Sequence, residues 1–295
     1  MQKLTYINAY GDSVVFGGDP PQLLRSVSGF SRPDGKIVTV QGAYQDGTTV
    51  QRVQLPARKV KLTFDLPNHS DREAMYRTKA EIERVLSTGR CFRQDTGEMG
   101  TLVYQNDIGT WRIKALPDGA ITWGTRFLNQ IIKNKLNFSC PDPYLADDTL
   151  NTATLKMGNG GLILPNTFPF SLGVAQFTGQ LVNSGSVESP CEIAIYGTGD
   201  TPAVVNHTTG ARLIISETLT TGDVMHINTD PNALECYIVH PDGSREDAFG
   251  WMDPTIAITG FQLIPGTNSV EYVPSAPTQQ SRATIIWRSR VEGIG

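Results

Sequence analysis

The stretch CPDPYLADD at residues 140–148 gathers the side chains that could do chemistry near the middle of this 295-residue chain. One thiol, three carboxylates and a tyrosine fall within nine residues, so a metal site or a catalytic site is the first possibility. Its three aspartates, however, lack the alternating ligand spacing and the mid-loop glycine of a calcium-binding loop. Both prolines hold the preceding residue in extended geometry and lack the N–H that a strand ladder needs. We therefore interpret the segment as a hinge between two halves of the chain, formed by Cys140, Pro141, Asp142, Pro143 and Tyr144.

The rest of the sequence shows no catalytic, cofactor or metal-binding motif. Its four cysteines are at least 45 residues apart, and no CxxC pair offers the local spacing of a zinc site. We expect these thiols to be reduced and buried. The four histidines show no i,i+4 pairing, and glycine-rich phosphate loops and GxSxG are absent from the sequence. We predict no catalytic residue, no cofactor and no metal, and hence no enzyme.

Two other functional classes depend on side chains that only folding could bring together. Asp147/Asp148 and Glu246/Asp247 are adjacent carboxylates that a cell-wall hydrolase could use, although such pairs on loops are usually solvated. Trp251 and Phe261 could form a saccharide-binding surface or fill a sandwich core, and we expect the core.

Charge divides the chain near the same hinge. Residues 1–145 carry 19 Lys and Arg against 14 Asp and Glu, whereas residues 146–295 carry 6 against 15. This contrast indicates two domains, 1–145 and 146–295. The opening residues lack the apolar core of a signal peptide, and no apolar run reaches about 18 residues, so we expect neither export by a cleaved signal nor a membrane span.

Strand patterns dominate the chain. Residues 59–66 alternate polar and apolar side chains, as in a half-buried strand, and shorter strands are expected at 101–105, 111–116 and within 120–138. From about residue 160 onward, turn signals recur along the chain, a pattern typical of a β-sandwich or a jelly roll. They comprise Asn159-Gly160, Thr209-Gly210, Thr221-Gly222, Asp242-Gly243 and Pro265-Gly266.

One helix is predicted near 71–88, where it would pack on a sheet. Ser70 and Glu73 have the spacing of a capping box, and Gly89 is expected to end the helix. Met75, Ile82, Val85 and Leu86 form its apolar face.

Several segments, taken in order, resemble the distal tail protein (Dit) family of long-tailed, siphovirus-type bacteriophages. They are AYQDG at 43–47, LPARKVKL at 55–62, the capped helix, TLVY at 101–104, IKALP at 113–117, CPDPY at 140–144, NHTTG at 206–210, GDVMHINT at 222–229, LIPGTN at 263–268 and IIWR at 285–288. The resemblance covers nearly the whole chain.

The resemblance implies a mainly β protein with an N-terminal β-sandwich-like ring domain carrying one α-helix, followed by a galectin-like C-terminal β-sandwich. It implies a structural role in the virion, as a hexameric ring that joins the tail tube to the baseplate hub and the host-recognition apparatus. The implied partners are the other five copies, the tail tube protein, the tail hub or tail-associated protein, the tape measure protein and a receptor-binding protein. DNA would only pass through the ring channel, no membrane is involved, and assembly would take place in the host cytoplasm. The alternative function is a carbohydrate-binding module that aids adsorption to the host cell wall.

Residues 41–56 are predicted to form a hairpin arm of the N-terminal domain. Asp46-Gly47 is a strong turn signal, but its flanks are polar, so the hairpin would gain little from a core of its own. In a ring it could reach the next subunit and pair there, as the arm of the family does. The expected interface residues are Tyr44, Gln45, Asp46, Gly47 and Arg52.

Overall fold

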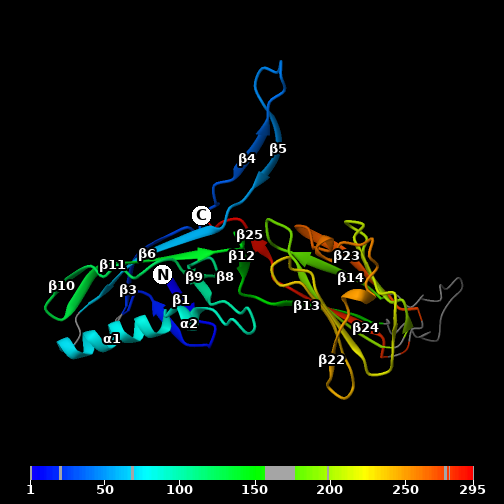
Figure 1. Ribbon diagram of the computed structural model, residues 1–295. Helices are drawn as coiled ribbons and strands as arrows, with labels where there is room; N and C mark the ends of the chain where they lie inside the picture. The colour runs from blue at the N-terminus through cyan, green and yellow to red at the C-terminus, as the bar shows by residue number, and fades with distance from the viewer. Residues whose placement is uncertain are drawn as a thin grey trace, which may run out of the picture. The chain divides into compact units, whose positions relative to one another are not determined.

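The computed structural model describes residues 2–19, 22–67, 70–156, 177–197, 199–275, 278 and 280–294. The chain forms two compact units, Met1–Asp148 with Val291–Gly295, and Thr149–Arg290 (Figure 1). The sequence placed one boundary after residue 145, whereas residues 146–148 and 291–295 belong to the first unit. The second unit is therefore an insertion in the first, rather than a domain that follows it. No helix among the described residues has the length and apolar character needed to cross a bilayer.

The core of the first unit is formed by two sheets, each built from neighbours that run antiparallel where their register is given. The order of the first sheet is β2 (Ser13–Phe16), β1 (Lys3–Ile7), β7 (Thr101–Gln105), β8 (Thr110–Lys114), β12 (Leu145–Asp147) and β25 (Arg290–Val291). The order of the second is β10 (Thr125–Phe127), β11 (Gln130–Cys140), β6 (Arg58–Leu66) and β3 (Leu23–Ser28), with β9 (Leu116–Pro117) also paired to β11.

These two sheets share one hydrophobic core. The alternation predicted for residues 59–66 is confirmed, because β6 buries every second side chain along most of its length. Tyr6 of the first sheet packs on Phe138 of the second, with ring centroids 4.9 Å apart, and Phe16 packs on Phe64 at 4.8 Å. The period of two in the sequence thus places one face of each sheet against the other.

Two of the predicted strands are interrupted. The apolar strip at 120–138 is split into β10 and β11 by a turn at Leu128 and Asn129, and Leu128 has a φ of +50°. The strand expected at 111–116 ends at Lys114, and a short β9 follows. Neither break carries a glycine or a proline, so turn signals in the sequence could not locate them.

The predicted helix is present as α1 (Arg72–Val85), and its apolar face is confirmed. Met75, Ile82 and Val85 lie in the core of the first unit, as does Leu86 just beyond the helix. A second, four-residue helix, α2 (Thr88–Cys91), was not predicted.

Both ends of α1 differ from the prediction. The cap is Asp71 rather than Ser70, and its carboxylate accepts the backbone N–H of Ala74 at 2.7 Å. Asp is as good a cap as Ser, so the helix begins one residue later and the predicted capping box is not used. Gly89 lies within α2 and does not end α1, which stops at Val85.

The second unit is a β-sandwich with a core of its own. The order of its larger sheet is β13 (Asn151–Lys156), β24 (Arg282–Trp287), β15 (Cys191–Tyr196), β20 (Val224–Asn228), β21 (Glu235–Val239) and β22 (Arg245–Asp247). The order of the smaller is β14 (Thr178–Asn183), β23 (Gly266–Val273), β17 (Ala203–Asn206) and β18 (Arg212–Ile214); β16 (Gly199–Asp200) pairs with β19 (Thr218–Leu219). Two short 3₁₀ helices span Phe249–Trp251 and Ile258–Gly260.

The large aromatic side chains predicted to fill the core of this sandwich do lie in or against it. Phe261 is buried, and Trp251 is partly buried against the same cluster. Four predicted turns are confirmed by glycines with positive φ at Gly210, Gly222, Gly243 and Gly266. The turn expected at Asn159-Gly160 lies outside the described residues. The predicted fold class, a mainly β protein with a sandwich in its second half, is confirmed.

Candidate functional site

The hairpin predicted as an arm is a two-stranded sheet of its own. It consists of β4 (Lys36–Val40) and β5 (Thr49–Gln54), which extend away from the two sheets of the first unit (Figure 1). The sequence placed the arm at 41–56, so it contained the turn and β5 but missed β4. Ile37–Val40 is a run of β-branched residues, and that signal could have found the first strand.

The tip of the arm is organised by the residues named as its interface. Gln45 donates its backbone N–H to the Gly42 carbonyl at 3.1 Å, and its side-chain amide donates to Thr49 Oγ1 at 2.8 Å. Gly47 has a φ of +78°, which explains the glycine in the turn. Tyr44 is fully exposed. The tip is therefore held by its own polar contacts and leaves one large ring in solvent.

The two faces of the arm differ in character. Residues paired across a ladder share a face; Ile37 pairs with Val53 and Thr39 with Val50 on one side. This apolar face is unburied, since Ile37 is 60% exposed, Val50 58% and Val53 57%. The opposite face carries the pairs Lys36–Gln54, Val38–Arg52 and Val40–Thr49. Because of the register shift between Val38 and Thr39, Val50 lies on the same face as Val53, although the two residues are three apart in β5. Strict alternation along the sequence would place them on opposite faces.

The predicted hinge residues lie inside the first unit. β11 ends at the buried Cys140, and the turn that follows carries the chain to β12 in the other sheet. Asp142 accepts the backbone N–H of Tyr144 at 3.0 Å, and the Pro143 carbonyl accepts from Arg58 Nε at 2.7 Å. The prolines do end the strand, as their chemistry requires, but the segment joins two sheets. The boundary between the units comes at Asp148.

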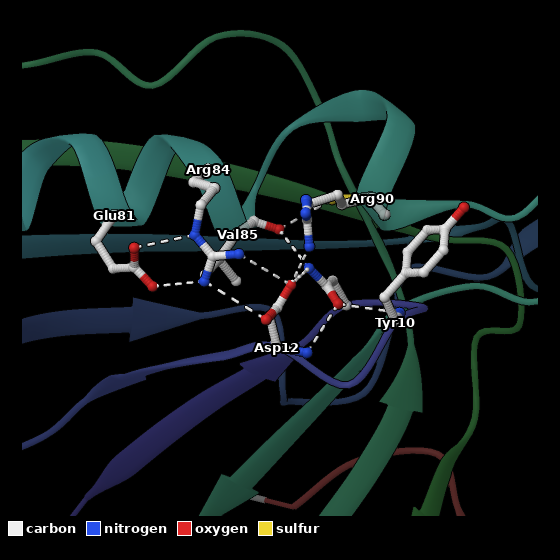
Figure 2. Close-up of polar contacts among 8 residues, drawn as sticks. Tyr10, Asp12, Glu81, Arg84, Val85 and Arg90 are labelled. Atoms are coloured by element: carbon white, nitrogen blue, oxygen red, sulfur yellow. Dashed lines mark hydrogen bonds and ion pairs between the residues drawn. The ribbon is translucent and has the colours of Figure 1, made fainter.

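A polar network fastens α1 and α2 to the turn between β1 and β2, as Figure 2 shows. Asp12 in that turn pairs with Arg84 of α1, at 3.2 Å, and with Arg90 of α2. Asn8 donates to the Val85 carbonyl at 3.1 Å and to Asp12 at 3.3 Å. The hydrogen bond from Asn8, with those from both arginines, lowers the pKa of Asp12. No local pattern predicts this network, because Asp12 lies 72 residues from Arg84 and 78 residues from Arg90.

The cysteines are buried free thiols, as expected. Burial raises the pKa of Cys140, Cys191 and Cys236 to about 12, so these groups stay protonated at neutral pH. Among the described residues, no group of three or more His, Cys, Asp and Glu side chains is arranged to hold a metal ion. His69 lies outside that part of the chain.

One histidine has partners that its sequence neighbours do not suggest. His240 Nδ1 lies 2.9 Å from Asp223 Oδ1, and His240 Nε2 lies 3.1 Å from Glu246 Oε2. Hydrogen bonding to Asp223 and then to Glu246 raises the pKa of His240. Both ring nitrogens face carboxylates, and no hydroxyl or thiol of the described residues is hydrogen-bonded to the imidazole. The arrangement ties the ends of β21 and β22 to the turn before β20.

The outward face of the larger sheet in the second unit carries two tyrosines whose rings are already covered. The Tyr237 ring is stacked on His226 at a centroid distance of 4.9 Å, and the Arg245 guanidinium lies 3.3 Å from its centroid. Arg282 lies 4.0 Å from the Tyr196 centroid. Saccharides stack on open ring faces, so these rings do not form such a platform as they stand.

The fold has known counterparts, although sequence searches find none. No protein-family model matches the chain, and no curated protein sequence matches it either. The crystal structure of the SPP1 Dit (gp 19.1) protein, described as a paradigm of the hub adsorption apparatus in phages that infect Gram-positive bacteria, matches with a TM-score of 0.64 at 14% identity. That match covers 97% of this chain and 98% of the other.

The phage P2 baseplate provides two further matches at 15% identity. A chain of this baseplate in its activated conformation with Ca matches with a TM-score of 0.60, and its counterpart with Sr matches at 0.59. Each covers 99% of both chains. The chain therefore has the Dit-like fold over nearly its whole length.

Proposed function

We propose that the chain is a distal tail protein of a long-tailed bacteriophage, a structural component of the tail tip. The observation that carries this proposal is the likeness to SPP1 Dit, which extends over both compact units and leaves only a few per cent of either chain unmatched. The two matched phage proteins belong to a hub adsorption apparatus and a baseplate. In this role the protein works through surface complementarity repeated around a symmetric assembly, and no bond-making step is needed.

The assembly that we propose is a hexameric ring that joins the tail tube to the baseplate hub. The tail tube protein, the tail hub protein, the tape measure protein and a receptor-binding protein would contact it, and DNA would only pass through its channel. The protein would be made in the host cytoplasm and end in the virion.

The arm supports this assembly, because its apolar face is available for a neighbouring copy. Full burial contributes about 1.5–3 kcal/mol for each aliphatic side chain, and more than half of Ile37, Val50 and Val53 remains exposed. Covering this face would therefore contribute on the order of 3–5 kcal/mol per arm. A closed ring repeats that contribution at every subunit interface, whereas a hairpin alone in water is marginally stable.

Deleting the arm tests the proposal. Lys36 and Gln54 are opposite each other at its base, so replacing Ile37–Val53 by Gly-Gly closes the ladder with a two-residue turn. The wild-type protein should give a hexameric mass in light scattering after size exclusion, and six-fold rings in negative stain. The deleted chain should be monomeric with an unchanged circular dichroism melt. A monomeric wild-type protein across the micromolar range, or unchanged hexamers from the deleted chain, would contradict this account.

A further inference from the structure

The base of the arm is built around a buried charge. Arg58 is the first residue of β6, immediately after the arm, and only 3% of it is exposed. Its guanidinium donates to four backbone carbonyls: Nε to Pro143 at 2.7 Å, Nη1 to Gly29 at 2.5 Å and to Ser31 at 2.8 Å, and Nη2 to Glu292. Burial lowers the pKa of Arg58, although nearby acidic groups oppose this shift.

The four carbonyls come from segments that are far apart in the sequence. Gly29 and Ser31 precede β4, so the guanidinium bridges the chain entering the arm and the chain leaving it. Pro143 precedes β12, which leads to the second unit, and Glu292 follows the return from that unit. One planar group with five N–H donors can satisfy all four acceptors at once.

The backbones around this charge approach closely. Gly29 has a φ of +101°, and a Cβ there would lie 2.2 Å from the Lys59 carbonyl oxygen. A Cβ on Gly293 would lie 2.3 Å from the backbone nitrogen of Arg32. The Ile294 N–H donates to the Phe30 carbonyl at 2.9 Å. The C-terminal segment is thus fastened to the segment between β3 and β4 that leads into the arm.

We propose that Arg58 is the positioning residue of the arm, and that with residues 291–294 it fixes the direction in which the arm leaves the first unit. Among the strands of the described residues, β4 and β5 pair only with each other, so no larger sheet holds the arm. Its direction is therefore set at its base, where both of its connections meet the guanidinium. The inference rests on the proposed function for its purpose, because a ring closes only if every arm points at its neighbour.

The test measures the direction of the arm within one chain. Spin labels go on Thr48→Cys at the tip and Ala80→Cys on α1, two exposed positions in a chain whose native thiols are buried. Labelled chains are diluted into unlabelled protein, so that pulsed electron–electron distances report only intrachain pairs. The intrachain distance can be measured whether or not the protein forms a ring. A result that contradicts the role of Arg58 can therefore be told apart from one that contradicts the proposed function.

The matched variants are Arg58→Met and Arg25→Met. Arg25 pairs with Asp65 at 2.5 Å, and Asp65 lies seven residues further along β6, about 23 Å from Arg58. Wild type and Arg25→Met should give one narrow distance distribution, and Arg58→Met should give a distribution at least twice as broad. Arg58→Lys should also broaden it, because an ammonium cannot span the planar set of acceptors.

Truncation after Val291, which keeps all of β25, tests the same proposal if Arg58→Met fails to fold. The shortened chain removes the Glu292 acceptor and the Ile294 bond, and should broaden the distribution while the helix and sheets stay folded. A narrow, unshifted distribution in folded Arg58→Lys and in the truncated chain would overturn the proposal. Equal broadening in Arg25→Met would overturn it too.

Discussion

At the scale of single residues, His240 shows how folding can create a titrating group. Asp223, which is 3% exposed, and Glu246 both face its imidazole, and Asp223 also accepts the Thr220 hydroxyl at 2.7 Å. Burial opposes ionisation of Asp223, but hydrogen bonds from Thr220 and His240 outweigh it and lower the pKa of Asp223. The pair therefore favours the charged form of both groups.

The pH dependence of this pair has a definite sign. The pKa of His240 is raised in the folded state, so its contribution to stability is full below the unfolded value of about 6.5 and is lost as pH rises through the folded pKa. We predict that His240→Gln lowers the melting temperature of the protein more at pH 5.5 than at pH 9. An equal loss at both pH values would contradict this, and His207→Gln, whose exposed imidazole contacts Glu271 alone, is the control.

At the scale of elements, the Asp12 network decides how α1 and α2 sit on the sheet. Its carboxylate is the common acceptor for two helices, and Arg84 is held in place by Glu81 at 2.6 Å. Glu73 and Arg77 pair within the same helix at 2.5 Å but are exposed, and no hydrogen bond or ion pair between described residues joins either side chain to another element. The Asp12 network should therefore stabilise the position of α1 on the sheet, whereas the Glu73–Arg77 pair should stabilise only α1 itself.

We predict that Asp12→Asn increases hydrogen exchange of the α1 amides at pH 7, whereas Glu73→Gln leaves exchange nearly unchanged. The pKa of Asp12 is lowered in the folded state, so its contribution is full above the usual Asp value of about 3.9 and is lost as pH falls through the folded pKa. The difference between wild type and Asp12→Asn should shrink as the pH is lowered from 7 to well below the usual Asp value. A difference that persists there would show that the aspartate acts through packing.

The faces of the arm allow a second prediction at this scale. Ile37→Ser, Val50→Ser and Val53→Ser together should shift hexamers to monomers, raising the assembly midpoint concentration by about 100-fold or more. Val38→Ser with Val40→Ser removes aliphatic groups from the opposite face and should leave the midpoint within a few-fold of wild type. Sedimentation velocity over a concentration series measures both, and equal effects of the two variants would refute the assignment of the apolar face.

At the scale of the whole molecule, the second unit is inserted between β12 and β25 of the first. Its sandwich has a complete core, from Leu155 to Trp287. A fragment beginning at residue 146 and ending at 295 would carry β25 and most of β12, but not β8, the strand of the first unit that β12 pairs with. We expect those pieces to be exposed and unfolded in isolation.

We predict that residues 149–290 form a soluble, β-rich monomer that unfolds cooperatively. Limited proteolysis of the 146–295 fragment should trim it to nearly the same core, which mass spectrometry of the products would show. The full chain, in which β12 and β25 are paired, should resist cleavage at those sites. Protection of residues 291–294 in the fragment, or the absence of a cooperative transition in 149–290, would contradict this division.

The sequence by itself determined the features that depend on local pattern. Alternation along residues 59–66 predicted β6, apolar spacing predicted the buried face of α1, and glycines predicted the turns of the second unit. The order of short segments also pointed to the Dit-like fold. These features are local because a period of two or 3.6 residues, or a positive φ, is set by immediate neighbours.

The tertiary structure decided what depends on residues distant in sequence. The local pattern of Cys140–Tyr144 predicts a hinge, yet in the structure this turn joins two sheets of the first unit. The reason is that β12, which follows the turn, pairs with β8 more than 30 residues upstream. The apolar face of the arm depends on a register shift, and the role of Arg58 depends on carbonyls from three other segments. Pairing partners and buried acceptors follow from the packing of the whole unit, so no local pattern in the chain encodes them.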